Sequence, residues 1–509
     1  MSEAQVAASQ PAGLRYSSGP GRWVLLATVL GSAMASIDAT VVGIALPAIG
    51  HDFNSSLATL QWVVTAYTLT LAGLLLFAGA LGDKYGRKRI FIFGVVWFAV
   101  ASVLCGIAPD SPFLIAARAV QGIGAALLTP GSLAIIEASF APEDRGRAIG
   151  AWSGLSGVGS AIGPFLGGWL IQALSWRLIF VINLPLAVLV LAVSLRHVPE
   201  SRDPSATGPV DYVGGALVTT GLIGLTYGLI EGPTVGWMKP TPLIALIGGC
   251  VLLAAFVWWE HRSPAPMMPL SLFASAQFSA ANVVTFAVYG ALGGALFLLP
   301  IQLEQVSGYS PLQAGISLLP VTFIMLALSS RSGALAARIG PRLQMTVGPL
   351  VIAAGLALFV RIGHGGNYVT EVLPAMLVFG LGLAINVAPL TATVLAAGPA
   401  EHAGMASAVN NDVARAASLI AVAVLPAAAG LTGAAYLHPA KFSAGFHTAS
   451  LISAGLCVVG AAVAAAFIRN PRKAAAPGAV TQCPVSCGLD APPARAAVAV
   501  AVPGSDQQS

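Results

Sequence analysis

Two stretches of this chain decide its fold. Residues 79–94 read GALGDKYGRKRIFIFG, and residues 333–348 read GALAARIGPRLQMTVG. Glycines and basic residues recur at matching positions of the two stretches, 254 residues apart. The same offset carries six long apolar runs at the start of the chain onto six at its end, within a few residues. We therefore expect two repeated halves of six helices each.

Composition places most of this chain in lipid. Only 8% of its 509 residues are charged and 57% are hydrophobic, with a mean hydropathy of +0.84, whereas soluble domains carry about 25% charged residues. Fourteen apolar runs, the first near 23–48 and the last near 445–468, reach the roughly 20 residues that a spanning helix needs. The sequence predicts an all-α polytopic membrane protein with 14 transmembrane helices. It excludes a soluble enzyme, a disulfide scaffold and a disordered chain.

Two of the runs, 211–230 and 241–259, have no counterpart under the offset, so we expect them to be an insertion between the halves. The expected organisation is a cytoplasmic segment, a first six-helix bundle, two inserted helices with flanking loops, a second six-helix bundle and a disordered cytoplasmic tail. Their residues are 1–22, 23–196, 197–270, 271–470 and 471–509.

Basic residues orient the chain, because cytoplasmic loops of membrane proteins are rich in Lys and Arg. With the N-terminus inside, 18 of the 24 basic residues fall in inner segments and 4 in outer loops. We expect both termini to be cytoplasmic and the protein to span the cytoplasmic membrane. The net charge of +5 is too small and too scattered for nucleic acid. Cys483 and Cys487 have no partner pair or nearby His, so we expect no metal site.

Two charges inside the first half are costly in lipid and therefore informative. Asp38 and Arg118 fall at similar depth in the outer half of their helices, since each residue adds about 1.5 Å. We expect them to face each other in the bundle interior. Either they form a permanent structural ion pair, or Asp38 takes up and releases a proton beside Arg118.

The second half carries polar residues that are weaker candidates for a substrate cavity. Asp412 and Arg415 are spaced i, i+3, so they either neutralise each other on one helix or line the substrate path. Isolated amides in membrane helices often only join neighbouring helices. The full candidate set is Gln302, Glu304, Asn386, Asn410, Asn411, Asp412 and Arg415.

Glycines mark one face of the run 145–171. Gly159, Gly163 and Gly167 repeat every four residues, which leaves bare backbone for a neighbouring helix to approach. Pro164 removes a backbone hydrogen bond and can kink the helix. Close packing alone explains this pattern, and a role in transport is the alternative.

The loop G79-A-L-G-D-K-Y-G-R-K-R89 resembles the signature loop of the major facilitator superfamily. In that family the acid and the first Arg belong to a gate that holds the two halves in the outward-facing state. The resemblance assigns a cytoplasmic gate to Gly82, Asp83, Gly86, Arg87 and Lys88. The second copy has Ala337 in place of Asp83, so only the first copy can form this latch.

Further motifs resemble the fourteen-helix drug–proton antiporter branch of that superfamily, over about residues 20–470. They are I37-D-A-T-V-V-G-I-A-L-P47, R118-A-V-Q-G-I-G-A-A126 and G159-S-A-I-G-P-F-L-G-G168. The resemblance implies the major facilitator fold, a role for Arg118 in proton transfer, and an antiporter motif that includes Gly159, Gly163, Pro164, Gly167 and Gly168. The family commonly has Asn at the position of Gly43.

The sequence therefore predicts a proton-coupled antiporter that exports amphipathic drugs or antibiotics by alternating access. The expected partners are a small-molecule substrate, protons and the lipid bilayer, with no cofactor and with function as a monomer. No GxxxxGK[ST] loop exists to hold ATP, so the proton gradient is the expected energy source. A proton-coupled importer of a metabolite is the alternative. A membrane-embedded enzyme is disfavoured because all seven His fall in or beside loops, and a sensor because a long soluble domain is missing.

Overall fold

The computed structural model describes residues 13–203, 208, 210–264, 266–397, 403–432 and 438–470. The expected tail 471–509, with Cys483 and Cys487, and the start of the N-terminal segment lie outside these residues. Within them, fourteen helices are long and apolar enough to cross a membrane, which confirms the predicted number.

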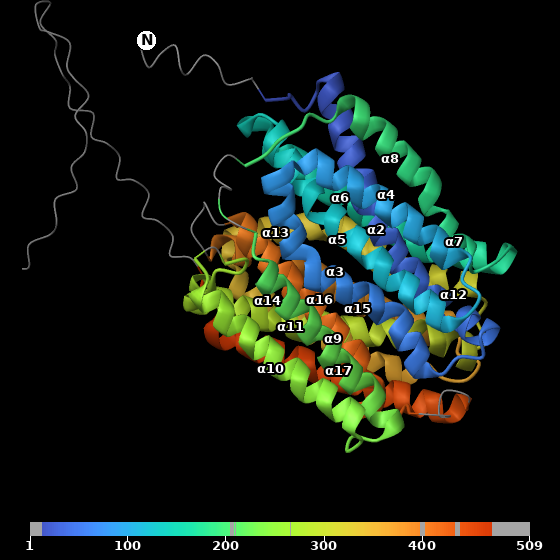
Figure 1. Cartoon of the computed structure of the whole chain (residues 1–509). Coiled ribbons are helices and arrows are strands. Elements are labelled where there is room, and N and C mark those ends of the chain that lie inside the picture. The colour runs from blue at the N-terminus through green and yellow to red at the C-terminus, as the bar shows by residue number, and fades with distance from the viewer. Residues whose placement is uncertain are drawn as a thin grey trace, which may run out of the picture. The chain divides into compact units, whose positions relative to one another are not determined.

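Seven helical elements form the six spans of the first half, since α7 and α8 together make one span (Figure 1). They are α2 (Gly19–Asp52), α3 (Leu57–Tyr85), α4 (Arg87–Gly106), α5 (Ser111–Ser139), α6 (Pro142–Ala173), α7 (Leu178–Val181) and α8 (Asn183–His197). The inserted pair is α9 (Tyr212–Val235) and α10 (Pro240–Arg262).

The second half contains six further spans, several of which join two shorter elements. Its elements are η2 (Leu270–Ala274), α11 (Ala276–Ile301), η3 (Gln302–Val306), α12 (Pro311–Ser317), α13 (Leu319–Ile339), α14 (Pro341–Leu358), η4 (Phe359–Arg361), η5 (Tyr368–Val372), α15 (Leu373–Ala396), α16 (Ala403–Ala428) and α17 (Pro439–Phe467). Most spans extend past their apolar runs, because polar residues at each end still close helical hydrogen bonds.

Short polar side chains begin several of these helices. Ser18, Ser56, Asp110 and Ser275 each accept a hydrogen bond from a backbone N–H in the first turn of the following helix. Ser310 goes further and forms a reciprocal capping box with Gln313. Such caps satisfy the N–H groups that a helix leaves free at its start.

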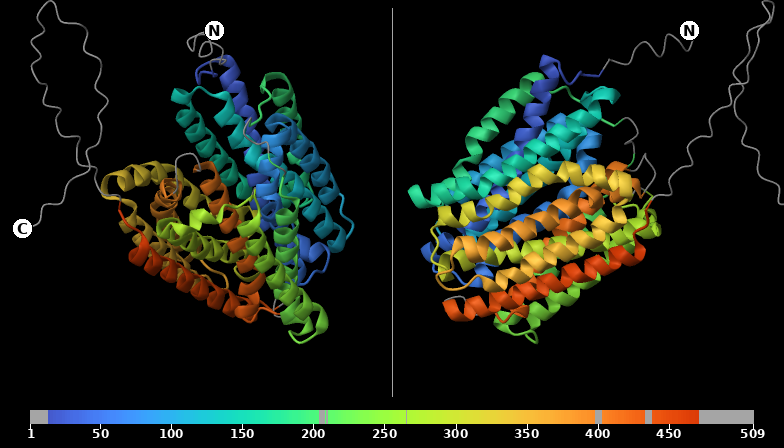
Figure 2. Two further views of the ribbon diagram at one scale, coloured as in Figure 1. Left: turned by 60° about the vertical axis from the view of Figure 1, so that its left-hand side comes forward. Right: turned by 180° about the vertical axis from the view of Figure 1, so that it is seen from behind.

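The repeat is visible in which helices touch. In the first half α4 packs on α5, α3 on α5, α2 on α6, α2 on α8 and α4 on α8. In the second half the helices 254 residues further along make the same pairs: α14 with α15, α13 with α15, α11 with α16, α11 with α17 and α14 with α17. Figure 2 shows the two bundles side by side, the first blue to green and the second yellow to red.

The turns inside the two quoted stretches are also equivalent. Gly86 and Gly340 stand 254 residues apart between consecutive helices, with φ of 118° and 87°, where a residue with a side chain is strained. The segment that follows the sixth span of each half then caps the helix that starts after this glycine, α4 in the first half and α14 in the second. Lys88 N donates to Glu200 Oε1 at 3.1 Å, and Arg342 N donates to Asn470 Oδ1 at 3.0 Å.

The inserted helices lie against the edge where the halves meet. Helix α9 contacts α3 of the first half and α16 of the second, while α10 contacts α9 (Figure 1). Leu69, Ala72, Leu222 and Leu419 form a small apolar cluster at this junction. The Thr219 hydroxyl also donates to the Gly73 carbonyl at 3.0 Å. The insertion therefore touches both halves.

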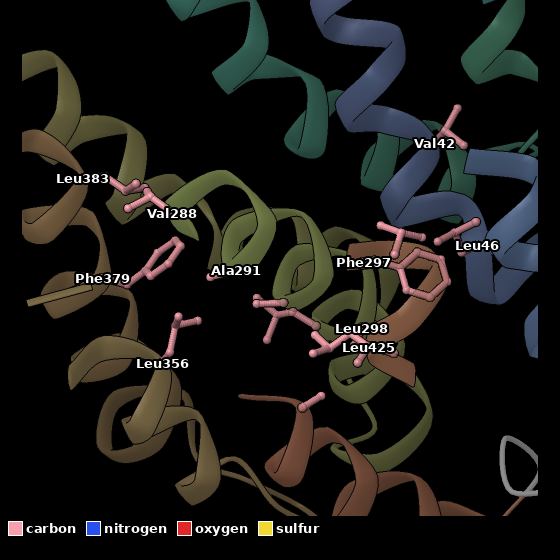
Figure 3. Close-up of a cluster of buried hydrophobic side chains, with 14 of the residues drawn as sticks. Val42, Leu46, Val288, Ala291, Phe297, Leu298, Leu356, Phe379, Leu383 and Leu425 are labelled. Atoms are coloured by element: carbon pink, nitrogen blue, oxygen red, sulfur yellow. The ribbon is translucent and has the colours of Figure 1, made fainter. Parts of the chain in front are cut away.

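Apolar side chains fill the centre of the bundle. The largest cluster of buried residues runs from α2 of the first half into α11 and α14 to α17 of the second. In Figure 3, Phe297 of α11 lies beside Leu46 of α2, where the two halves meet. This contact is near the end of the bundle where α2 finishes at Asp52. The other end carries Lys84 of α3 and Arg87, Lys88 and Arg89 of α4. We call the end with these four basic residues the basic end, and the end with Asp52 the opposite end.

Candidate functional site

The structure brings the two charges predicted to meet into direct contact. Arg118 Nη1 of α5 lies 2.5 Å from Asp38 Oδ2 of α2, and the two side chains are 1% and 0% exposed. The guanidinium also donates through Nε to the Val63 carbonyl of α3 at 3.2 Å. Three helices thus fix one ion pair in the interior of the first half.

A ring of neutral side chains completes the hydrogen bonding of this pair. Gln121 Nε2 donates to Asp38 Oδ1 at 2.8 Å, and Gln121 Oε1 accepts from Arg118 Nη1 at 2.7 Å. Asn183 of α8 donates to the same Asp38 oxygen at 3.0 Å. Both amides also donate to the hydroxyl of Ser102 on α4, at 2.8 and 2.9 Å. The carboxylate therefore accepts three hydrogen bonds from protein groups.

Aromatic rings cover the guanidinium. The Arg118 Cζ lies 4.3 Å from the ring centroid of Tyr67 and 5.8 Å from that of Phe180, within the range of cation–π attraction. Tyr67 is itself 2% exposed. These rings shield the charges on the sides that the amides leave open. We define the ion pair with Ser102, Gln121, Asn183 and Tyr67 as the buried network.

A cavity of about 920 Å³ lies next to the buried network. Its volume falls in the range of about 300–1,000 Å³ typical of small-molecule sites. Its wall includes Tyr67, Trp152 and Arg415, together with serines and threonines of α2 and α6. Asp38 and Arg118 do not belong to the wall, so Tyr67 separates the pair from the cavity.

The cavity opens toward the basic end, because Asp83, Lys84 and Arg87 line it there. At the opposite end the halves are joined. A Cβ built on Gly168 of α6 would lie 2.8 Å from Leu312 Cα, and the Gly315 backbone touches Pro164 in the same way. Gln61 of α3 donates to the Val422 carbonyl of α16 at 2.6 Å. This state is open at one end and closed at the other.

The glycine face of α6 packs on α2, as its spacing requires. A Cβ on Gly159 would lie 2.8 Å from Ala33 Cβ, and one on Gly167 would lie 2.8 Å from Val41 Cγ1. A Cβ on Gly163 would overlap Thr40 Oγ1. The predicted antiporter motif thus serves two contacts: one face on α2 within its half, and Gly168 on α12 across the halves.

The predicted gate residues form a compact loop at the basic end. Asp83 and Arg87 pair at 2.8 Å, and Arg87 also donates to the Ala134 carbonyl at 3.4 Å. Gly86 N donates to the Gly82 carbonyl and closes α3. Lys88 Nζ donates to the Leu195 carbonyl at 3.2 Å. All of these contacts stay within the first half.

The structure separates the weaker candidates of the second half into three groups. Asn411 and Arg415 line the cavity. Hydrogen bonds from the side-chain amide hold two other candidates in place. Asn410 donates to Asn282 and Thr285 of α11, and Gln302 donates to the Ile362 carbonyl. The third group lies outside the cavity wall and comprises Glu304, Asn386 and Asp412. Each of these side chains has at least one buried polar atom without a hydrogen-bond partner among the described residues.

Sequence reasoning missed the neutral members of the buried network. Gln121 follows Arg118 by one helical turn, inside a motif already singled out, and Asn183 lies in W176-R-L-I-F-V-I-N-L-P185. For Gln121, the available signal was its position one helical turn from the buried charge of Arg118. Ser102 and Tyr67 carried none, because a Ser or Tyr in an apolar helix is common. Within the described ranges, no group of three or more His, Cys, Asp or Glu could hold a metal ion.

Fourteen spanning helices, a repeat of two bundles and a central cavity open at one end define a membrane transporter. The sequence profile described as the Major Facilitator Superfamily matches residues 28–423. The chain belongs to the major facilitator superfamily.

Its relatives include named resistance proteins. The chain is 37% identical to "Multidrug resistance protein Stp" of Mycobacterium tuberculosis, over 82% of this chain and 77% of that one. It is 34% identical to the "Tetracenomycin C resistance and export protein" of Streptomyces glaucescens, over 82% and 77%. Among solved structures it resembles an inward-facing, occupied bacterial homologue of the lysosomal transporter Spinster. That match has a TM-score of 0.64, 17% identity, and covers 88% of this chain and 97% of the other.

Proposed function

We propose that this protein is a proton-coupled antiporter that exports amphipathic small molecules across the cytoplasmic membrane by alternating access. The observation that carries the proposal is the position of the buried network. A carboxylate without solvent contact lies one side chain, Tyr67, away from a cavity of drug-molecule size. The proton gradient is the proposed energy source, and one chain holds the whole cavity, so we propose that a monomer suffices.

Protonation of Asp38 changes the network in a defined way. A protonated carboxyl loses the charge that balances Arg118, and one of its oxygens becomes a hydrogen-bond donor. All three present partners of Asp38 are donors, so the protonated form must rearrange. Because a buried guanidinium without a counter-charge is costly, this rearrangement can shift the helices that carry the pair. We propose that the shift couples proton movement to alternating access.

We propose that the basic end and both described chain ends face the cytoplasm, because cytoplasmic loops carry an excess of Lys and Arg. On that orientation, the present cavity faces the cytoplasm and takes up cargo. The other state requires the α6–α12 contact at Gly168 to separate and the gate loop with Asp83 to meet the second half. A proton then binds Asp38 from outside and leaves to the cytoplasm after the return step.

The relatives support export as the direction, since one is named for multidrug resistance and another for resistance to and export of tetracenomycin C. We propose a cargo of the same broad kind, an amphipathic drug or antibiotic. Expression in a host that lacks its own pumps, followed by growth on a panel of anionic, neutral and cationic toxins, identifies a working cargo.

Purified protein in liposomes tests the coupling. Cargo added to wild-type liposomes should drive a pH change in the lumen, and an imposed pH difference should drive cargo uphill. Asp38→Asn should abolish both effects while still exchanging labelled for unlabelled cargo. Cargo-driven proton movement by Asp38→Asn, or wild-type transport indifferent to the pH difference, would refute the proposal. Cargo and protons moving in the same direction would identify an importer instead.

A further inference from the structure

We infer that Arg415 is the anchor for an acidic group of the cargo, so that the cavity selects amphipathic molecules with a carboxylate, sulfonate or ionised phenol. The inference rests on the proposed function, because it names the chemistry of the molecule that the transporter carries. It starts from one cation in the cavity wall that has no ion-pair or hydrogen-bond partner among the described residues.

Arg415 lines the cavity from α16, and its side chain is half-buried. None of the five ion pairs in the described part of the chain includes it. Its Nε is buried without a hydrogen-bond partner among the described residues. Asp412, one turn earlier on α16, is within electrostatic range of Arg415 but forms no ion pair with it. Arg415 also lines the cavity, which Asp412 does not, so the guanidinium rather than the carboxylate faces an entering molecule.

The other charged groups of the cavity wall stand at the mouth and are engaged. Asp83 and Arg87 pair with each other. Lys84 Nζ donates to the Gly208 carbonyl at 3.2 Å, and Asp211 accepts from Gly214 N and from the Trp259 indole.

Glu137, the remaining charged group, is also at the mouth, within electrostatic range of Arg87 and Arg145. Arg415 is therefore the one charged residue in the described cavity wall that lies away from the mouth.

Position along the helix places Arg415 deep in the cavity. It follows the first residue of α16 by 12 positions, or about 18 Å at 1.5 Å per residue. There it acts electrostatically on Tyr67, the ring that covers Arg118. An entering molecule thus meets an aromatic ring and a guanidinium together.

A guanidinium favours anions with paired oxygens, because its planar fork donates two parallel hydrogen bonds to a carboxylate or sulfonate. Aromatic and apolar walls hold the rest of such a molecule. The Asp38–Arg118 pair behind Tyr67 offers no competing site for a cargo of either charge, since its two groups neutralise each other. Because Arg415 is the charged residue of the deep cavity wall among the described residues, it attracts anions and repels cations there.

Two fluorescent probes with the same aromatic skeleton test the inference. 8-Anilinonaphthalene-1-sulfonate carries a sulfonate, and N-phenyl-1-naphthylamine is its uncharged counterpart. Binding to the full chain in lipid nanodiscs is measured for wild type, Arg415→Gln and Arg415→Lys, with protein-free nanodiscs subtracted. Arg331→Gln is the matched control, because Arg331 of α13 is exposed and outside the cavity wall.

Wild type and the Arg331→Gln control should bind the anionic probe about tenfold more tightly than the neutral one, as expected for charge-assisted hydrogen bonds. Arg415→Gln should lose this preference with unchanged affinity for the neutral probe, which also shows that the variant is folded. Arg415→Lys should retain part of it. Equal wild-type affinities for both probes, or a preference that survives Arg415→Gln, overturn the inference.

The binding readout uses no gradient, so the two proposals fail separately. An Arg415-dependent anion preference in a protein whose transport ignores pH would leave the inference standing and refute proton coupling. Proton-coupled transport by a protein with no anion preference would do the reverse.

Discussion

Removing one partner of the Asp38–Arg118 pair should destabilise the fold far more than removing both. Asp38→Asn leaves a guanidinium that is 1% exposed without a counter-charge, and Arg118→Gln leaves a carboxylate that is 0% exposed in the same position. Breaking a buried ion pair from one side costs about 3–5 kcal/mol. Each single variant should lose that much stability.

The double variant Asp38→Asn/Arg118→Gln contains no buried charge. Asn keeps one oxygen for the Gln121 and Asn183 amides, and Gln keeps an NH₂ group that can donate. The remaining loss is that of imperfect neutral hydrogen bonds, about 1–2 kcal/mol. The two single losses together should therefore exceed the double loss by about 4 kcal/mol or more, and this difference is the interaction energy of the cycle.

The free energy of unfolding can be measured by SDS titration in mixed micelles, with tryptophan fluorescence as the signal. The Asp52–Arg177 pair is the matched control: its atoms lie 2.7 Å apart, yet its side chains are 44% and 36% exposed. Exposed pairs contribute about 0–1 kcal/mol, so Asp52→Asn should change little. If the double Asp38/Arg118 variant loses the sum of its two single losses, burial of the pair is not the source of its energy.

Three further variants test other parts of the structure. Tyr67→Ala removes the ring between the cavity and Asp38, so cargo-free liposomes should leak protons, whereas Tyr67→Phe should stay tight; equal leaks would contradict the shielding role. Gly168→Leu should force α6 away from α12 and raise maleimide labelling of cysteines placed at the opposite end, and unchanged labelling would count against this closure. Gly86→Ala should cost about 1 kcal/mol or more in SDS unfolding because φ is 118°. Gly82→Ala should cost less, since a Cβ there would lie 4.0 Å from Arg87 Cα, an ordinary contact distance. Equal losses would argue against backbone strain.

Sequence alone determined the number of spans, the repeat and the kinship with drug exporters. Each membrane helix satisfies its own backbone hydrogen bonds, so a run of about 20 apolar residues is enough to define it. The equivalence of Gly86 and Gly340 was readable for a similar reason, because a tight turn between helices demands local backbone freedom. The meeting of Asp38 and Arg118 was also within reach, since the cost of a charge in lipid leaves few places for either.

Only the tertiary structure decided which neutral side chains join that pair, which end of the cavity is open and which polar residues line it. Apolar side chains suit lipid and protein interior equally well, so hydropathy does not set the rotation of a membrane helix. Asn410 and Asn411 illustrate this: adjacent in sequence, one joins α16 to α11 and the other lines the cavity. The rotation of α16 that separates them comes from close packing with α3, α9 and α11, and packing is a property of the assembled bundle.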